Sequence, residues 1–370
     1  MEVAMYIWEL TNWPQFQWDK EKISKTLTNI RHEQGRLMGH MEALGFQLRE
    51  EAVLKTLTQD VLKSSEIEGQ KLDPDQVRSS VARRLGMDIG GLIPADRDVE
   101  GIVEMMLDAT RGYDQPLTAE RLLDWHAALF PTGRSGLRKF RIGKWRDDAD
   151  GPMQVVSGPL GREHIHYEVP SAEKLEAEMA AFLNWFSSDT TIDPVLKAGK
   201  AHLWFVTIHP FDDGNGRIAR AIADMALAQS EQSSQRFYSM SAQIRLERKS
   251  YYDNLERTQK GTMDITNWME WFLDCLTRAI EGSKGTLESV LYKARFWGAN
   301  AGEQFNDRQI KILNLLLEGF EGKLTSSKWA IIAKCSQDTA YRDILNLIER
   351  DVLLKSSEGG RSTSYTLAEI

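Results

Sequence analysis

Apolar residues recur every three to four positions along most of the chain, which is the spacing of amphipathic helices. A first such stretch follows Asp19, a residue type that caps helix N-termini, and continues through Leu44. A second runs from about Leu48 to Glu66 and stops at Gly69. The same spacing predicts further helices at 99–110, 118–129, 172–186, 193–208, 217–228, 245–259 and 266–279. The fold class is therefore predicted to be mainly α.

The helical spacing is interrupted between Gly133 and Val169, where glycine, proline and β-branched residues are frequent. Two runs in this region, 153–156 and 164–167, flank a Gly-Pro-Leu-Gly sequence at 158–161. Short β-type runs on either side of turn residues predict a β-hairpin.

The C-terminal part of the chain forms its own pattern. Helical spacing predicts helices at 307–318, 326–334 and 336–350, and two short β-type runs then surround Gly359-Gly360. Three helices and a hairpin in this order predict a winged helix-turn-helix. Its recognition helix would open near Ser336, with Arg342 and Arg361 as contacts to DNA. Because the local charge is only mildly basic and winged helices also bind proteins, a DNA partner and a protein partner both stay open.

Length and composition limit the class of protein. A chain of 370 residues is too long for one ordinary core, so we expect three domains, at 1–85, 86–290 and 300–370. With 42% hydrophobic and 27% charged residues, a globular protein is expected. No apolar run approaches the ~20 residues of a membrane span, and the N-terminus lacks a secretory pattern. We therefore expect a cytoplasmic protein without a membrane partner.

Charge and cysteine content exclude further classes. The net charge of −8 argues against broad nonspecific binding of nucleic acid. Cys275 and Cys335 are the only cysteines of the chain, too few for a disulfide framework or a cysteine-rich zinc site.

The segment His209-Pro-Phe-Asp-Asp-Gly-Asn-Gly-Arg-Ile-Ala-Arg220 combines features of a phosphate site. Pro210 disfavours helical geometry at His209, so the preceding helix should end there. Gly214 and Gly216 permit a tight backbone path in which successive N–H groups converge on an anion. A helix that begins near Gly216 adds its positive N-terminal end.

The side chains of this segment supply the remaining groups for attack on a phosphate. Arg217 and Arg220 lie on one helical face and can both fork onto phosphate oxygens. Asp213 is a carboxylate of the kind that holds Mg²⁺, and His209 can accept the proton of an attacking hydroxyl. Phe211 would anchor the loop in the core. These groups are not a Walker P-loop, because G-x-x-x-x-G-K-[ST] is absent from the chain.

The segment resembles the signature of the Fic family, H-P-F-x-[D/E]-G-N-G-R-x-x-R, and meets its nine defining positions. The resemblance implies a helical core over 86–290 and transfer of AMP from ATP to a Ser, Thr or Tyr hydroxyl of a protein. It also implies the role of each matching residue. His209 would be the base, Asp213 the Mg²⁺ ligand, and the nucleotide would be held by Gly214, Asn215, Gly216, Arg217 and Arg220.

A second motif lies upstream of the first. Ser64, Glu68 and Gly69 fit [S/T]-x-x-x-E-[G/N], which resembles the inhibitory motif of Fic proteins and implies an inhibitory helix at about 56–69. A Glu68 carboxylate paired with Arg220 would take the place of a γ-phosphate. On its own the pattern also fits a solvated helix end that is followed by a glycine cap.

The predicted hairpin corresponds to the flap with which Fic proteins hold the backbone of a target, although an ordinary surface hairpin has the same pattern. The residues expected to contact a target are Met153, Gln154, Val155 and Val156. On the second strand, His164 and His166 could ligate a metal, but no third ligand stands at a suitable sequence spacing, so we expect exposed flap residues.

Several aromatic and charged residues have both a functional and a structural interpretation. Tyr251 and Tyr252 could form a wall of the adenine pocket, although core packing is expected for at least one of them. His126 matches the family but is expected to be a packed core histidine, and Arg146 is expected to form a structural ion pair.

The N-terminal segment, with Trp8, Trp13 and Trp18, reads as a short extended cap and resembles a module that often precedes Fic domains. Aromatic residues of this kind pack in a core more often than they contact a ligand. We expect this module to serve regulation or dimer formation.

The sequence thus predicts a protein adenylyltransferase that is inhibited by Glu68, with ATP, Mg²⁺ and a target protein, or the chain itself, as partners. Three alternatives stay open. One is a DNA-binding regulator in which this domain modifies the chain or senses nucleotide. Another is a hydrolase that removes AMP, and the third is a transferase of phosphocholine or phosphate.

Overall fold

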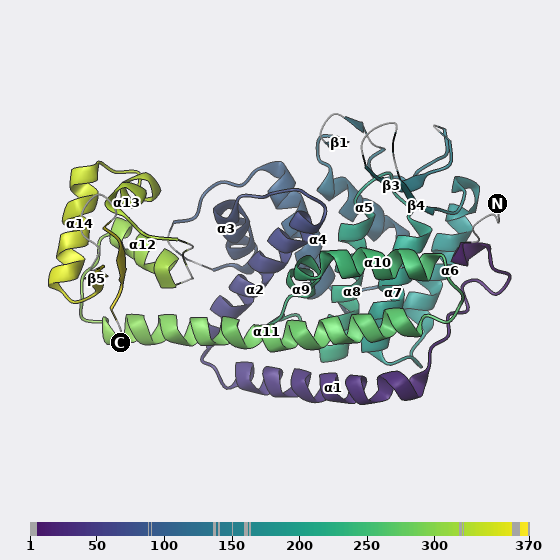
Figure 1. The fold of residues 1–370 in the computed structure, drawn as a ribbon, viewed down its shortest axis with the longest axis horizontal. Helices are drawn as coiled ribbons and strands as arrows, with labels where there is room; N and C mark the ends of the chain where they lie inside the picture. Colours follow the sequence, from purple (N-terminus) through teal and green to yellow (C-terminus); the bar gives the residue numbers. More distant parts are fainter. Residues whose placement is uncertain are drawn as a thin grey trace. The chain divides into compact units, whose positions relative to one another are not determined.

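The computed structural model describes residues 6–87, 89, 91–135, 138–139, 141–149, 151–158, 162, 164–317, 320, 322–356 and 363–368. The fold is mainly helical, as the apolar spacing predicts (Figure 1). The helices are α1 Lys20–Glu42, α2 Phe46–Ile67, α3 Pro74–Leu85, α4 Arg97–Arg111, α5 Ala119–Leu129, α6 Leu175–Ser188, α7 Pro194–Ile208, α8 Asn215–Glu231, α9 Met240–Leu246, α10 Arg248–Gln259, α11 Thr266–Ala299, α12 Asp307–Leu317, α13 Ser326–Ile332 and α14 Gln337–Glu349.

The strands are short and pair two by two. They are β1 Arg134–Ser135, β2 Arg138–Lys139, β3 Gln154–Ser157, β4 His164–Glu168, β5 Leu353–Lys355 and β6 Tyr365–Leu367. Single 3-10 turns lie at Ile7–Glu9 and Ala172–Lys174. Among the described residues, no helix has both the length and the apolar character of a membrane span.

The chain divides into two compact units. The first comprises Met1–Gly45 and Val53–Ser283, and the second comprises Phe46–Ala52 and Lys284–Ile370. Helices α2 and α11 each contribute residues to both units.

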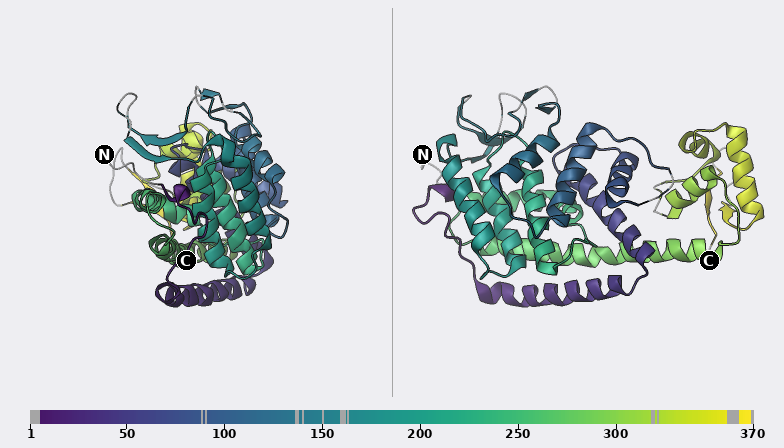
Figure 2. Two further views of the ribbon diagram at one scale, coloured as in Figure 1. Left: turned by 90° about the vertical axis from the view of Figure 1, so that its right-hand side faces the viewer. Right: turned by 180° about the vertical axis from the view of Figure 1, so that it is seen from behind.

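The helix pair α7–α8 forms the centre of the first unit, with α6 packed beside α7 (Figure 2). Nearly every side chain of α7 and most of α8 are buried, so these helices have no polar face and form the core. Asp193 caps α7 by accepting a hydrogen bond from the backbone N–H of Val195, and Pro194 occupies the first helical turn. On α11, Trp268 donates a hydrogen bond to the carbonyl of Gly199, 2.8 Å away, which joins α11 to α7.

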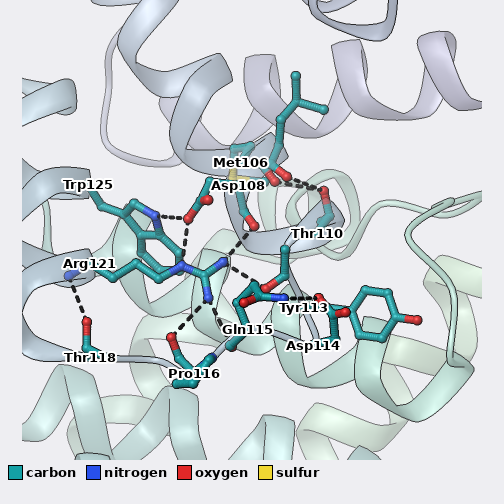
Figure 3. A network of polar contacts seen from close by, with 12 residues as sticks. Met106, Asp108, Thr110, Tyr113, Asp114, Gln115, Pro116, Thr118, Arg121 and Trp125 are labelled. Carbon is teal, nitrogen blue, oxygen red and sulfur yellow. Dashed lines mark hydrogen bonds and ion pairs between the residues drawn. The ribbon is translucent and has the colours of Figure 1, made fainter.

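The connection between α4 and α5 is built around the side chain of Arg121 (Figure 3). Its Nε lies 2.7 Å from Asp108 Oδ2, and its other nitrogens donate to carbonyl oxygens of the connection. The same Asp108 oxygen accepts a hydrogen bond from Trp125 Nε1 at 2.7 Å. One guanidinium therefore satisfies backbone groups that a loop would otherwise leave to water.

The predicted hairpin is confirmed by the antiparallel strands β3 and β4. The register shifts by one residue between Val155 and Val156, which leaves His166 as an extra residue in β4. Tyr167 is buried and donates to the carbonyl of Thr207 at 2.9 Å, so the hairpin is attached to the end of α7. Residues 159–161 of the predicted turn lie outside the described residues.

Two helix boundaries differ from prediction. The expected helix 245–259 is two helices, because the backbone breaks at Glu247 between α9 and α10. Helix α11 continues far past position 279, through Gly282 and Gly285. Each glycine costs about 1 kcal/mol relative to alanine, but burial of Val290 and Phe296 on this part of the helix opposes that cost.

The opening segment also differs from prediction. Ile7–Glu9 is a 3-10 turn instead of extended chain, because Glu9 Oε2 accepts a hydrogen bond from the N–H of Tyr6 at 2.7 Å. Trp8 donates to the carbonyl of Glu168 and Trp13 donates to Glu178, each over 2.9 Å.

In the second unit, α12, α13 and α14 are followed by the antiparallel pair β5–β6. Its core contains fully buried Trp329, Ile344 and Leu347. Ser336 caps α14 and Arg342 is exposed on that helix, whereas Gly359, Gly360 and Arg361 lie outside the described residues. The assignment of a winged helix-turn-helix stays a prediction.

Candidate active site

The turn between α7 and α8 begins where α7 is forced to stop. His209 adopts φ 54° and ψ 59°, in the left-handed region, which ends the helix. Pro210 disfavours only the right-handed helical conformation at His209 and does not by itself explain the positive φ. Its N–H still donates to the carbonyl of Phe205 at 2.9 Å. Arg146 holds the next backbone groups: its N–H donates to the carbonyl of Pro210 at 2.9 Å, and its Nε donates to the carbonyl of His209 at 2.8 Å.

The imidazole of His209 is oriented by its own helix. Its Nδ1 lies 3.2 Å from the carbonyl oxygen of Val206. A carbonyl can only accept a hydrogen bond, so Nδ1 carries the proton and Nε2 keeps its lone pair. Loss of water around the ring lowers the pKa of His209 to about 4, against the opposing hydrogen bond to Val206. At neutral pH the ring is therefore uncharged and can accept a proton at Nε2.

The glycines and Asn215 shape the rest of the turn. Gly214 has φ +85°, and a Cβ at this position would lie 3.0 Å from Phe130 Cε2. Asn215 is buried, and its side chain accepts from the N–H of Phe211 and donates to the carbonyl of Phe211 at 3.0 and 2.7 Å. Both polar groups of this side chain therefore brace the loop, and a phosphate contact at Asn215 would come from its backbone N–H.

The N-terminus of α8 presents free backbone donors. The first hydrogen bond within the helix is donated by Ile218 to the carbonyl of Gly214. The N–H groups of Asn215, Gly216 and Arg217 thus have no partner within the helix, as in every helix start. Together with the helix dipole, they favour an anion at this position.

The two arginines of α8 are buried and partly unsatisfied. Arg220 donates through Nε to Ser64 Oγ and through Nη2 to the carbonyl of Ser64, both at 3.0 Å. Arg217 donates through Nη1 to Gln70 Oε1 at 3.0 Å, and its guanidinium lies 5.0 Å from the centre of the Phe130 ring. Two buried donors, Arg220 Nη1 and Arg217 Nε, find no hydrogen-bond partner in the described part of the chain. Buried unpaired donors of this kind point to an anionic ligand.

Glu68 lies against these donors. It is the residue at which α2 ends, and its Oε1 is 2.8 Å from Arg220 Nη2. A Cβ added at Gly216 would come within 2.3 Å of the same oxygen, so the carboxylate covers the first turn of α8. Burial alone would raise the pKa of Glu68, but the charge of Arg220 and its hydrogen bond outweigh burial and lower it. Glu68 is therefore an anion where α8 attracts one.

The end of α2 is shaped so that Glu68 reaches α8. Gly69 adopts φ +83°, and the N–H groups of Glu68 and Gln70 both donate to the carbonyl of Ser65. Gly69 thus caps the helix, and Glu68 beside it forms an ion pair with Arg220. Ser64 is fully buried and faces Arg220.

Asp213 is partly exposed at the turn between α7 and α8. Its side chain is 38% exposed, and Oδ1 lies 2.6 Å from the N–H of Gly214 and 3.6 Å from Arg217 Nη2. The described residues donate no hydrogen bond to the second carboxylate oxygen. A carboxylate with one open oxygen fits the way in which proteins bind Mg²⁺, through one or two carboxylates together with substrate phosphates.

The tyrosine pair divides into one core and one surface residue. Tyr251 is buried and its hydroxyl is 2.9 Å from His202 Nε2, so the expected core packing holds for it. Tyr252 is 37% exposed, and its hydroxyl donates to Glu68 Oε2 over 3.4 Å. Only Tyr252 is therefore open to a ligand beside Glu68.

The flap residues lie on an open strand. Gln154 and Val156 are exposed, whereas Met153 and Val155 are partly buried. Gln154 donates across the pair to Glu168 at 2.8 Å. The described residues pair β3 with β4 alone, so its other edge is open.

Two further sequence predictions can be compared with the structure. His126 is fully buried and stacks on Phe211, with ring centres 4.2 Å apart, as expected for a core histidine. Burial lowers the pKa of His126 to about 4. Arg146 does pair with Asp148 at 2.9 Å, but it also donates to the backbone of the loop between α7 and α8, which the sequence did not predict.

Sequence reasoning missed several contacts of the site. Gln70, Phe130 and Tyr252 all touch the arginines or Glu68, and none stands in a motif that identifies this role. The sequence spacing offers no third ligand to the two flap histidines, but the folded chain brings one beside them. Glu256 of α10 lies beside His164 and His166, although it is far away in sequence.

Two family models match the chain. The model described as the Fic/DOC family matches residues 116–227, which include the site. The model described as a domain of unknown function, DUF4172, matches residues 6–87, which include Glu68.

Curated relatives match over part of their length. Protein adenylyltransferase Fic of Nematostella vectensis is 33% identical over 114 residues, which are 30% of this chain and 25% of the relative. Protein adenylyltransferase Fic of Drosophila melanogaster is 26% identical over 227 residues, which are 60% of this chain and 41% of the relative. The match thus spans between a quarter and two fifths of the length of these relatives.

A solved structure has a similar fold. A Fic domain containing signaling protein from Bacteroides thetaiotaomicron superposes with a TM-score of 0.52 at 18% identity, over 71% of this chain and 97% of the other. The match of residues 116–227, the complete loop between α7 and α8 and this similarity of fold all agree. Residues 116–227 therefore form a domain of the Fic/DOC family.

Proposed function

We propose that the protein transfers AMP from ATP to a hydroxyl group of a protein. One observation carries the proposal: an uncharged His209 with a free Nε2 stands in the same loop as a helix start with unpaired arginine donors. A proton acceptor and an anion site in one loop are what transfer of a phosphoryl-linked group requires. The relatives' name, protein adenylyltransferase, agrees with this chemistry.

In the proposed reaction, the hydroxyl oxygen attacks the α-phosphorus of ATP and His209 Nε2 accepts the hydroxyl proton. The new bond joins that oxygen to phosphorus, and the bond between the α-phosphorus and the bridging oxygen to the β-phosphate breaks. Pyrophosphate leaves with the electron pair. Arg217, Arg220 and the N–H groups at the start of α8 bind the negative oxygens.

Asp213 would hold the Mg²⁺ that accompanies ATP, and the ion would supply positive charge to the phosphate chain. The open edge of β3 would receive the target as an added strand, with the exposed Val156 against it.

We further propose that Glu68 inhibits this reaction. Its carboxylate occupies the anion position at Gly216 and uses the Arg220 group that a terminal phosphate would need. A bound triphosphate must displace this carboxylate or bind against its repulsion. Removal of the Glu68 carboxylate should therefore raise the rate of AMP transfer.

The test compares wild type, Glu68→Gly and the double variant Glu68→Gly/His209→Ala, each incubated with radiolabelled ATP and cell lysate. Label at the α-phosphate should enter protein strongly in Glu68→Gly, weakly in wild type and not in the double variant. Label at the γ-phosphate enters protein through the kinases of the lysate, and its amount should be the same in all three samples. More γ-label with Glu68→Gly than with the double variant would mean phosphate transfer and would refute AMP as the transferred group.

Glu66→Gly is the matched control for the brake. It removes a carboxylate from the same helix end, one that pairs with Lys63 and Arg245 instead of Arg220. This variant should label as weakly as wild type. Equal labelling by Glu66→Gly and Glu68→Gly would assign the effect to loss of helix order and not to the freed arginine.

A further inference from the structure

Three potential metal ligands meet on the side of the flap that faces α10. His164 and His166 come from β4, and Glu256 comes from α10, which packs against β4 (Figure 1). One ligand atom of each residue lies within 4.8 Å of the other two. None of the three belongs to the loop between α7 and α8.

The backbone of β4 directs both histidines to this place. His166 is the extra residue at the irregular register of the hairpin, and such bulges re-aim side chains. The two imidazole rings stand edge to face with centres 4.6 Å apart. His166 Nδ1 is 2.6 Å from Glu256 Oε2, and His164 Nε2 is 3.9 Å from Glu256 Oε1.

His166 forms a second hydrogen bond through its other ring nitrogen. Its Nε2 lies 2.6 Å from Ser157 Oγ, on the neighbouring strand. In the structure His166 Nδ1 must carry a proton and donate a hydrogen bond to the Glu256 carboxylate, since that carboxylate only accepts. If a cation replaced this proton, Nε2 would become the donor to Ser157, and a hydroxyl can serve in either role. Ligating histidines characteristically have such a second partner.

We propose that His164, His166 and Glu256 form a site for a zinc-class divalent cation. Two imidazoles and one carboxylate are a ligand set of zinc sites that keep an open position. Metal–ligand bonds of about 2.0–2.2 Å require the ligand atoms to approach each other to roughly 3.5 Å. The His164 side chain is 68% exposed and is free to make this movement.

Lys260 competes for the same carboxylate. Its Nζ lies 2.7 Å from Glu256 Oε1, the oxygen that faces His164. Binding of the cation must displace this ammonium group. Removal of the Lys260 charge should therefore strengthen binding of the cation. No such effect is expected if the two histidines have only a structural role.

The cation would join strand β4 to helix α10 by coordinate bonds. Strand β3, whose edge is open, is paired with β4 and would lose freedom with it. The site would thus set how rigidly the flap is held, whatever the flap contacts.

The experiment titrates Zn²⁺ into the full chain without an affinity tag, by calorimetry, with Co²⁺ absorption as a second measurement. One ion should bind per chain, and bound Co²⁺ should give the visible bands of a four-coordinate site. His164→Ala and Glu256→Gln should each weaken binding more than about 100-fold. Ser157→Ala should weaken it about tenfold, and Lys260→Gln should strengthen it.

Matched controls separate this site from other histidines and from loss of fold. His40→Ala changes an exposed histidine of α1 and should leave the titration unchanged. His164 makes no hydrogen bond to the described residues that its loss could break, so a folded His164→Ala protein is expected by circular dichroism. Absence of Zn²⁺ binding by wild type, or equal binding by wild type and His164→Ala, would overturn the proposal.

Discussion

At the scale of single residues, Arg146 contacts the loop between α7 and α8 directly, although it lies outside the motif. Its side chain is fully buried and divides its donors among the carbonyls of His209 and Pro170 and the carboxylate of Asp148. Arg146 touches the backbone of His209 and not its ring. It is therefore a positioning residue, whose loss would move the imidazole without removing it.

Arg146→Lys should lower the rate of AMP transfer and leave ATP binding in place. Lysine keeps the charge but cannot reach three acceptors with a planar fork. In a Glu68→Gly background we expect kcat to fall roughly 100-fold, the cost of about 1 Å of misplacement, with KM for ATP within about twofold. Steady-state labelling over a range of ATP concentrations measures both constants.

Arg141→Lys controls for this change. Arg141 lies in the same segment and forms an exposed ion pair with Asp147, so its substitution should leave both constants unchanged. A larger effect on KM than on kcat in Arg146→Lys would contradict a positioning role.

At the scale of elements, the side chain of Arg121 links the residues of the α4–α5 connection. Arg121→Ala should destabilise the first unit by roughly 1–2 kcal/mol, because the carbonyls of the connection lose a shared donor and the Asp108 carboxylate loses its charged partner, while water replaces part of these contacts. The midpoint of urea unfolding, followed by tryptophan fluorescence, measures the loss. Arg111→Ala, in which the side chain gives up one exposed hydrogen bond to the carbonyl of Arg84, should cost far less.

Helix positions and the motif could be predicted from sequence because both depend on local spacing. Asp19, Thr118 and Ser336 all cap helices where capping residue types stand before apolar repeats. The break at Glu247 and the length of α11 could not be predicted, since tertiary packing outweighs propensity there.

The candidate site also has a part that the sequence predicts and a part that it does not. The roles expected within 209–220 follow from residue types in one short loop, and the structure brings that loop to the start of α8. The partners of these residues come from other elements: Gln70 follows α2, Phe130 follows α5 and Glu256 is on α10. Such long-range contacts have no local signal, so a single sequence cannot identify them.

At the scale of the whole molecule, three histidines are held in the uncharged form, two of them buried and His209 partly buried. Burial lowers the pKa of His126 and His209 to about 4 and that of His202 to about 3. In the unfolded chain their pKa is about 6.5. The unfolded state therefore binds more protons as the pH falls below 6.5, and stability is lost progressively down to the folded-state pKa.

The free energy of unfolding should fall by about 1.6 kcal/mol for each of these histidines between pH 6.5 and pH 5. Urea titrations at a series of pH values measure the slope. His202→Gln removes one of the three groups and should lessen the pH dependence, even if it lowers stability at pH 7. Equal slopes for wild type and His202→Gln would contradict this assignment.

The contact between Glu68 and the start of α8 has a reciprocal consequence. A carboxylate and a phosphate that compete for Arg220 must weaken each other by the same factor, because the two equilibria are linked. High nucleotide concentration would then loosen the last turn of α2. Conversely, any event that moves this turn away from α8 would raise the affinity of the protein for nucleotide. No residue of the loop between α7 and α8 would need to change.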